Sequence, residues 1–282
     1  MSRRLLRGRI GAVVAVTAIM LAACGTPPRP SAPTLQEPAS SATPPAPRVA
    51  LTPALDHVHG LHLDAQGTVL AGTHTGLVAI DTAGRTARIG ESDDDFMGLT
   101  GVPGTDHLFA SGHPGASSSM PNPLGLIEST DGGRNWAAKS LTGEVDFHAL
   151  ATDGEILVGF DGRSGLLIST NAGTEWSKGA ALPAAALAVT DAGMWALTRD
   201  GLQHSTDTGR TFTTVAGAPS LVLFSAATDG SLWGVDTGGT TWRSRTGQAW
   251  EQRAVVGRVE AVLAIDYDTA YAATAQELYT LD

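Results

Sequence analysis

The chain has a single cysteine among its 282 residues, so no disulfide can form within it. Aromatic residues supply only 5% of the sequence, and no segment keeps an apolar period of 3.6 residues. The missing period argues against a bundle of amphipathic helices. Long apolar stretches are also scarce, and the run over residues 11–23 is too short for a stable membrane span.

Basic residues are few, because 18 lysines and arginines stand against 28 acidic residues. Four of the arginines lie in the first ten residues, which contain no acidic residue. Without that segment, 14 basic residues remain against 28 acidic ones, a formal charge of −14. A domain of this charge is not expected to bind nucleic acid or an anionic membrane surface.

The arginine-rich start followed by an apolar run has the order of an export signal. The run ends in LAAC, which contains the sole cysteine, Cys24, and resembles a bacterial lipobox. The resemblance implies cleavage before Cys24 and lipid, such as palmitate, on its thiol. We therefore expect residues 1–23 to be a lipoprotein signal peptide. The mature protein would be held at the extracytoplasmic face of the cell membrane by this lipid anchor alone.

The segment that follows is rich in proline, with eight prolines over residues 25–50. Such a composition cannot bury enough apolar surface to fold, and proline stiffens the chain into an extended form. Residues 24–50 are therefore expected to be a lipidated cysteine followed by a disordered tether.

From residue 51 to residue 282 the sequence is rich in glycine and threonine, and short apolar runs alternate with turn signals. This pattern predicts an all-β domain. Units of about 38 residues recur, with one longer spacing of about 51 where GASSSMPN is inserted. The units begin near His59, Met97, His148, Ala185, Phe224 and Ala261. Four short strands in each of six units predict a six-bladed β-propeller, with seven blades as the alternative. The last unit has room for three strands, so residues 49–54 are expected to supply its fourth.

A second repeat lies inside the units: STDGGRNW at 129–136, STNAGTEW at 169–176 and STDTGRTF at 205–212. A shorter form, SRTGQAW, stands at 244–250. The repeat resembles the Asp-box, or BNR repeat, of sialidases and related propellers. The resemblance implies a hairpin between the third and fourth strands of a blade, on the rim opposite the binding face. The residues assigned this structural role are Ser129, Asp131, Gly133, Trp136, Ser169, Asn171, Gly173, Trp176, Ser205, Asp207, Gly209 and Phe212.

The domain also resembles a group of exported bacterial lipoproteins that are filed as sialidase-like or glycosylhydrolase-like. The segments that support this resemblance include HVHGL at 57–61, GTHTGL at 72–77 and SGHP at 111–114. The resemblance implies the propeller fold, and it does not fix an activity. A standard sialidase is not expected, because the tyrosines all lie in the last unit and only one arginine, Arg199, is well placed.

Residues two apart on a strand point to the same face, and the starts of the first three units place histidine and aspartate at such positions. The turns after the second strands open on the same rim and add two histidines. The candidate metal ligands are His57, His59, His74, His113, His148 and Met97. The candidate ligand-binding residues are Arg199, Asp95 and Asp146. His62, His107 and His204 are expected at the surface or in turns, and residues 91–94 in a solvated loop.

Imidazole groups with a carboxylate or a thioether suit zinc or copper, so a metal site is the first hypothesis. The same residues suit a small-molecule or glycan site. A hydrolase acting on glycans is the alternative from another class, with Glu144, Asp95 and Asp146 as weak catalytic candidates. A propeller that binds an envelope protein is the third. A closed ring has no free sheet edge, so a monomer is expected.

Overall fold

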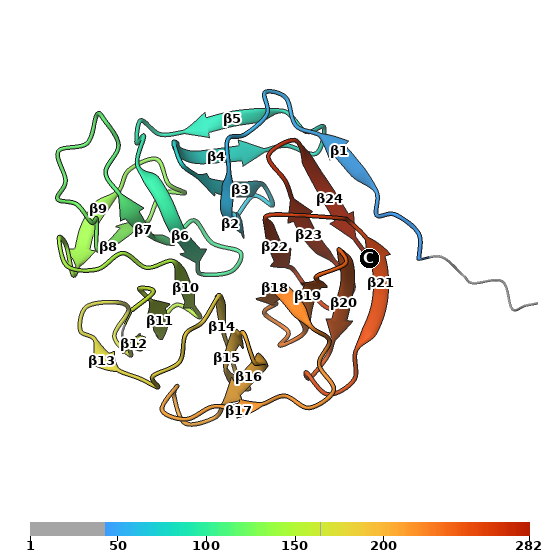
Figure 1. The fold of residues 1–282 in the computed structure, drawn as a ribbon. Helices are drawn as coiled ribbons and strands as arrows, with labels where there is room; N and C mark the ends of the chain where they lie inside the picture. Colours follow the sequence, from blue (N-terminus) through green and yellow to red (C-terminus); the bar gives the residue numbers. More distant parts are fainter. Residues whose placement is uncertain (1–42, 164) are drawn as a thin grey trace, which may run out of the picture. The chain divides into compact units, whose positions relative to one another are not determined.

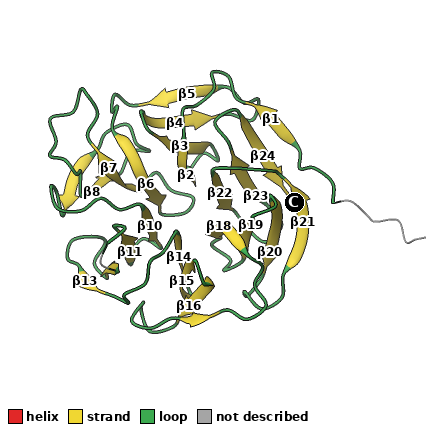
Figure 2. Ribbon diagram, viewed as in Figure 1, coloured by secondary structure: helices red, strands yellow, loops and turns green. Residues whose placement is uncertain are grey.

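The computed structural model describes residues 43–163 and 165–282. The expected signal peptide, Cys24 and most of the expected tether therefore lie outside the described residues. In the described part every element is a strand, and Figure 2 shows strands joined by loops. No helix there has the length and apolar character that a membrane crossing requires.

The strands form six antiparallel sheets of four strands each, arranged as a six-bladed β-propeller (Figure 1), which confirms the predicted fold class. Blade one consists of β2 (Val58–Leu63), β3 (Val69–Thr73), β4 (Gly76–Ile80) and β5 (Thr86–Ile89). Blade two consists of β6 (Asp95–Gly101), β7 (Leu108–His113), β8 (Leu126–Ser129) and β9 (Ala137–Ser140). Blade three consists of β10 (Ala149–Thr152), β11 (Leu157–Phe160), β12 (Leu166–Ser169) and β13 (Ser177–Lys178).

The other three blades have the same strand order. Blade four consists of β14 (Ala186–Thr190), β15 (Gly193–Thr198), β16 (Gly201–Ser205) and β17 (Thr213–Thr214). Blade five consists of β18 (Leu221–Ala226), β19 (Leu232–Asp236), β20 (Thr240–Ser244) and β21 (Glu251–Val255). Blade six consists of β22 (Ala261–Ala264), β23 (Ala270–Ala273), β24 (Glu277–Leu281) and β1 (Arg48–Ala50). The first strands of successive blades contact one another in a closed ring, β2–β6–β10–β14–β18–β22, and back to β2.

The ring is closed by β1, as the sequence predicts, although the strand begins at Arg48, before the expected range of 49–54. It pairs with β24, with Val49 opposite Leu278. The chain just before it also pairs with the propeller, because the amide of Ala46 donates to the carbonyl of Val255 at 3.1 Å. The disordered tether expected over residues 24–50 is therefore too long at its end, and residues 44–50 belong to the propeller.

The apolar core lies between neighbouring blades. Leu77 of blade one packs with Phe96, Leu108 and Ile127 of blade two, and all four are fully buried. Side chains of this size contribute roughly 1.5–3 kcal/mol each when they are removed from water. The middle strands therefore read as continuous apolar runs, and β3 is buried at all five of its positions.

The repeated turns tie each blade to the one before it. In the first, Gly133 has a φ of 80°, and a Cβ added there would overlap the side chain of Leu77 in the preceding blade. Glycine is therefore required both by the left-handed backbone and by the close approach. The equivalent pairs in the next three blades are Gly173 with Leu126, Gly209 with Ile168 and Gly247 with Trp195.

Hydrogen bonds inside the first turn explain its serine and its acid. Ser129 Oγ accepts from the amide of Gly133 at 2.8 Å and donates to Asp131 Oδ1 at 2.9 Å. Asp131 Oδ1 also accepts from the amide of Asn135 at 2.9 Å. The next two turns repeat the serine–glycine bond, at 2.9 Å from Gly173 and 3.0 Å from Gly209. Each turn joins the third and fourth strands of its blade.

The aromatic residue that ends each turn packs between blades. The ring of Trp176 lies 5.0 Å from that of Phe147, measured between centroids, and its Nε1 donates to Ser140 Oγ of blade two at 2.9 Å. Trp136 packs in the same way on Phe96, at 4.9 Å. These turns therefore hold neighbouring blades together.

Candidate metal centre

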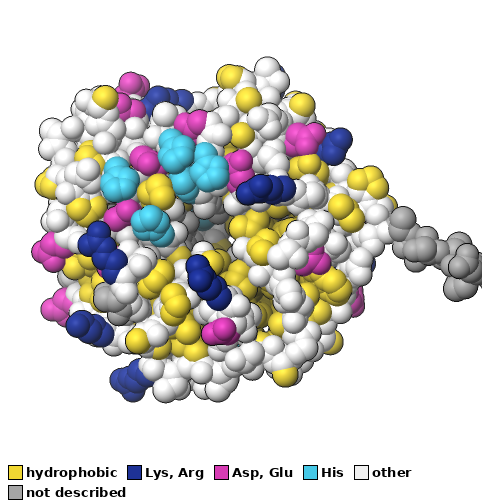
Figure 3. All heavy atoms as spheres, in the orientation of Figure 1, with side chains coloured by type: hydrophobic (Ala, Val, Ile, Leu, Met, Phe, Trp, Pro, Cys, Tyr) yellow, Lys and Arg dark blue, Asp and Glu magenta, His cyan; other side chains and the backbone are white. Residues whose placement is uncertain are grey.

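The strand pairing places the histidines and the repeated turns on opposite rims. Asp95 at the start of β6 lies opposite His113 at the end of β7, whereas Ser129 at the end of β8 pairs with Leu108 at the start of β7. The starts of the first strands and the turns after the second strands therefore share one rim, which we call the histidine rim. Figure 3 shows histidine side chains gathered on one face beside the central hollow. The hollow is a cavity of about 670 Å³ between the six first strands, and His59 and His148 line it.

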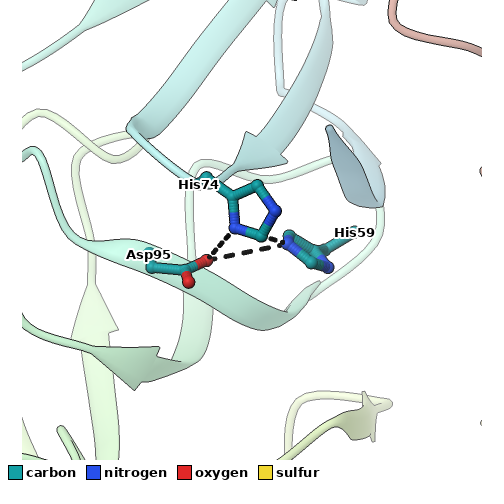
Figure 4. Close-up of side chains that lie close together, drawn as sticks. All are labelled: His59, His74 and Asp95. Atoms are coloured by element: carbon teal, nitrogen blue, oxygen red, sulfur yellow. Dashed lines mark hydrogen bonds and ion pairs between the residues drawn. The ribbon is translucent and has the colours of Figure 1, made fainter. Parts of the chain in front are cut away.

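The first histidine cluster consists of His57, His59, His74 and Asp95. His59 Nε2 lies 3.3 Å from His74 Nδ1. Asp95 Oδ1 lies 3.0 Å from His74 Nδ1 and 3.6 Å from His59 Nε2. Three donor atoms from β2, the β3–β4 turn and β6 thus face one another across the boundary of blades one and two (Figure 4).

His57 extends this cluster towards blade six. Its ring centroid lies 4.6 Å from that of His59 and 5.4 Å from that of His74. Its Nδ1 is 3.2 Å from Glu260 Oε2, and the same oxygen accepts from the amide of Val58 at 2.9 Å. Sequence reasoning missed Glu260, which lies just before β22 in blade six.

The buried position of His59 sets its charge. Burial lowers the pKa of His59, the neighbouring imidazoles of His57 and His74 lower it further, and Asp95 partly opposes them. The side chain is only 10% exposed, whereas that of His74 is 47% exposed. His59 is therefore held in the neutral form that binds metal ions, and His74 opens the group to solvent.

The spacing of the three donor atoms fits one bound ion. Ligand atoms about 2.0–2.2 Å from a tetrahedral zinc ion lie about 3.3–3.6 Å from one another. The separations of 3.3 and 3.6 Å fall at the two ends of that range, and the third, 3.0 Å, is slightly shorter. Among the described residues, only this group brings at least three ligand atoms of histidine, cysteine or carboxylate side chains within 4.8 Å of one another.

The second histidine cluster consists of His113, Asp146 and His148, with Asn122 beside it. Asp146 Oδ2 lies 3.3 Å from His113 Nε2 and 3.0 Å from His148 Nε2. His113 Nδ1 lies 2.9 Å from Asn122 Oδ1. This cluster joins blades two and three. The five histidines predicted to share a mouth therefore lie on one rim, in two groups.

The remaining predicted site residues lie outside these groups. Met97 is half-buried in the irregular part of β6, where the pairing with β7 is interrupted between Asp95 and Gly98. Arg199 is exposed in the turn between β15 and β16, and no ion pair joins it to another described residue. Glu144 is exposed in a turn, where its amide donates to the carbonyl of Leu141. In the described part of the chain, no hydrogen bond or ion pair joins it to either histidine cluster.

Two expectations about neighbouring residues are wrong. His62 is buried, not at the surface, because its Nε2 contacts the carbonyl of Thr105 at 2.9 Å inside the ring. Asp94 is buried as well, although a solvated loop was expected, because its carboxylate accepts from Ser92 Oγ and from the amide of Gly115. His107 and His204 lie outside the two clusters, on Glu128 and on the carbonyl of Ala192.

Comparison with known proteins places the chain by its fold. No family model matches the sequence, and a search of curated proteins finds no match either. Among solved structures, YCF48 bound to D1 peptide has a TM-score of 0.55 at 12% identity, over 85% of this chain and 99% of that one. A protein of unknown function from Bacteroides thetaiotaomicron has a TM-score of 0.60 at 11% identity, over 85% of this chain and 73% of that one.

A third similar structure is a GH74 xyloglucanase from Xanthomonas campestris, with a TM-score of 0.53 at 20% identity. The match covers 84% of this chain and 45% of the enzyme, so the chain spans less than half the length of that protein. At these identities the likeness shows the β-propeller fold alone, and any function has to be argued from the histidine rim itself.

Proposed function

We propose that the protein binds a divalent transition-metal ion, zinc or copper, through His59, His74 and Asp95. The observation that supports this most is the triangle of donor atoms, whose sides match the ligand spacing around a single ion. Two imidazoles and one carboxylate are borderline donors, which suit zinc, copper and other first-row ions better than calcium or magnesium. Three protein ligands leave a fourth position for water, His57 or a small ligand.

The surroundings also support a resident ion. Without one, His59 and His74 bring two nitrogen atoms to 3.3 Å beside a single carboxylate oxygen. Glu260 orients His57 at the edge of the group, as outer carboxylates orient metal-binding histidines. His59 also lines the central cavity, so a small ligand in the cavity would lie beside the ion.

The test is metal analysis of protein purified without a histidine tag. We expect tight zinc or copper binding that falls at least about 100-fold in the His59→Ala and His74→Ala variants, more than outer-sphere changes usually cause. His204→Ala is the matched control, because that imidazole bonds the carbonyl of Ala192 and stacks on Trp195 outside the cluster. Wild-type protein that retains no ion after incubation with either metal and dialysis would remove the proposal.

A protein partner is the second candidate, and it is supported by the likeness to YCF48, a propeller solved with a bound peptide. The surface limits what such a partner could be. Among the described residues, Val222 is the only large hydrophobic residue that is exposed. The described surface therefore offers no extended apolar patch for docking. A partner would bind through polar groups or through the bound ion, and a pull-down from membranes with and without chelator distinguishes these two modes.

A glycan hydrolase is less well supported by the site. Asp95 and Asp146 each lie against two imidazoles, and Glu144 lies exposed in a separate turn. The likeness to a xyloglucanase concerns the fold. Turnover of aryl glycosides that is abolished in Glu144→Gln or Asp146→Asn would favour the hydrolase over the binding protein.

We further propose that the protein works at the outer face of the cell membrane, anchored by lipid on Cys24. Support comes from the export-signal pattern that ends at the only cysteine of the chain. Cys24→Ser should release the protein from the membrane fraction. Continued membrane binding of that variant would contradict the anchor.

A further inference from the structure

The second histidine cluster has a bonding pattern that a bound cation would complete. Asn122 Oδ1 is an acceptor, so His113 Nδ1, 2.9 Å away, bears the ring hydrogen. In the neutral ring, His113 Nε2 then directs a lone pair at Asp146 Oδ2, 3.3 Å away. That contact is favourable only with a proton or a metal ion between the two atoms.

Asp146 adds a second, independent sign of an absent partner. Its Oδ1 is buried and has no hydrogen-bond partner among the described residues. A buried carboxylate oxygen without a donor is costly unless a cation satisfies it. The carboxylate thus lies under two imidazoles, with one oxygen crowded and the other unsatisfied.

The sequence insertion that interrupts the repeat supplies the orienting group. Asn122 belongs to the GASSSMPN insertion at 115–122, and a loop of this length is otherwise free to move. It is tied at its start, because the amide of Gly115 donates to Asp94 at 2.9 Å and Ser117 donates to Asp93. The chain just after it is tied as well, because the amide of Gly125 donates to the carbonyl of Val145 at 3.1 Å. These bonds hold the loop on both sides of Asn122.

We propose that His113, Asp146 and His148 form a second transition-metal site, with Asn122 as a positioning residue. The contacts of 3.3 and 3.0 Å from the carboxylate oxygen to the two ring nitrogens match the spacing of neighbouring ligands on one ion. The two Nε2 atoms lie more than 4.8 Å from each other, so one ring has to turn for both to reach one ion. Asn122 holds His113, whereas the side chain of His148 is 50% exposed and has room to turn. Imidazole nitrogen selects zinc or copper over calcium or magnesium.

This site does not rest on the first one, since the two clusters share no residue. Equilibrium dialysis of the untagged protein against zinc, followed by elemental analysis, counts the bound ions. We expect two equivalents in the wild type and one in each of Asp146→Asn and His148→Gln. The His59→Gln/His74→Gln variant should also retain one, and a variant that combines it with Asp146→Asn should retain none.

The outcomes separate the two sites. One equivalent in the wild type, unchanged by Asp146→Asn and by His148→Gln, overturns the second site and leaves the first. One equivalent that is lost in Asp146→Asn and kept in His59→Gln/His74→Gln overturns the first and supports the second. Circular dichroism of each variant verifies folding, and the two independent substitutions, Asp146→Asn and His148→Gln, guard against the failure of one.

The positioning role has its own readout. Asn122→Ala removes the acceptor for His113 Nδ1 and should weaken zinc binding at this site about 10–100-fold, as loss of an outer-sphere partner does. Asn122→Asp restores an acceptor and should restore the affinity. If Ala and Asp at position 122 weaken binding equally, the amide does not position His113.

Discussion

The two rims of the propeller differ in how far equivalent positions keep the same residue from blade to blade. On one rim, three turns have the same serine and glycine, and their serine–glycine hydrogen bonds measure 2.8, 2.9 and 3.0 Å. On the histidine rim, corresponding positions change from blade to blade. His59 and His148 stand at the starts of units one and three, where units four and six have Ala185 and Ala261. Repeated residues therefore build the ring, and the unrepeated ones are free to serve chemistry.

The polar groups of the histidine rim have no evident structural need. At the start of the first strand, blades four to six have Ala185, Phe224 and Ala261 around the same cavity, with Glu260 as the carboxylate next to them. Imidazoles and carboxylates in blades one to three are thus not needed to close the ring, and they add a desolvation cost. The difference between blades is the physical reason to look for a ligand on that half.

The strongest test of this comparison is a substitution on the rim of the repeated turns, which we call the turn rim, that leaves the histidine rim unchanged. Gly133→Ala forces a left-handed backbone on alanine and drives its methyl group into Leu77 of the neighbouring blade. The strain and the overlap together should lower the free energy of unfolding by about 2–4 kcal/mol. Urea unfolding measures the loss, and zinc dialysis of the folded variant should still give the wild-type stoichiometry.

Gly162→Ala is the matched control for that variant. Gly162 has a φ of 78°, but a Cβ there meets nothing within 4 Å. Only the backbone strain remains, which costs about 1–2 kcal/mol. Equal losses in both variants would mean that contact between blades at the turns contributes nothing.

The fold was largely predictable because the repeated units and turns can be recognised in a single sequence. The repeated turn marked the hairpin between third and fourth strands, and the shortened last unit pointed to closure by a segment before β2. The position of β1 was less accurate. Its pairing with β24 is set by partners more than two hundred residues away, such as Leu278 for Val49, and composition near the prolines gave no sign of it.

The site was predictable only in part. Strand alternation placed five histidines on one rim, and it did not separate them into two groups. That separation depends on which aspartate each ring reaches, Asp95 or Asp146, and on the loop that holds Asn122. His62 was misplaced for a similar reason. It lies on β2, three residues after His59, and its burial follows from a contact with the carbonyl of Thr105 in another blade.

Acid should act on the turn rim through its aspartates. The side-chain hydrogen bond from Asn135 lowers the pKa of Asp131, and that from Thr211 lowers the pKa of Asp207. A carboxyl group whose pKa is lower in the folded than in the unfolded state stabilises the fold above its unfolded pKa. This stabilisation is lost as the pH falls from about 5 through the folded pKa values.

The second turn of the series shows which variant tests this titration. Its Asn171 accepts from the amide of Glu175 at 2.9 Å, as Asp131 does from Asn135, without a titrating group. The Asp131→Asn/Asp207→Asn protein should therefore lose less melting temperature than the wild type between pH 5 and pH 2. Thermal unfolding followed by circular dichroism at several pH values measures both slopes. Identical slopes would exclude these two carboxylates as the acid-sensitive groups.

The smallest effect is expected at Met97, and it would sharpen the choice of metal on the histidine rim. Met97→Leu conserves volume, so it should change the free energy of unfolding by less than about 1.5 kcal/mol. Zinc affinity should stay within about twofold, because the close donor atoms are nitrogen and oxygen. Copper(I) binding should weaken measurably, because thioether sulfur is a soft ligand that favours this ion. Competition with a copper(I) chelator measures the change, and Met120→Leu, in the apolar core of the same blade boundary, is the control. If both substitutions leave copper(I) binding unchanged, Met97 is a packing residue and the rim binds its ions through histidine and aspartate alone.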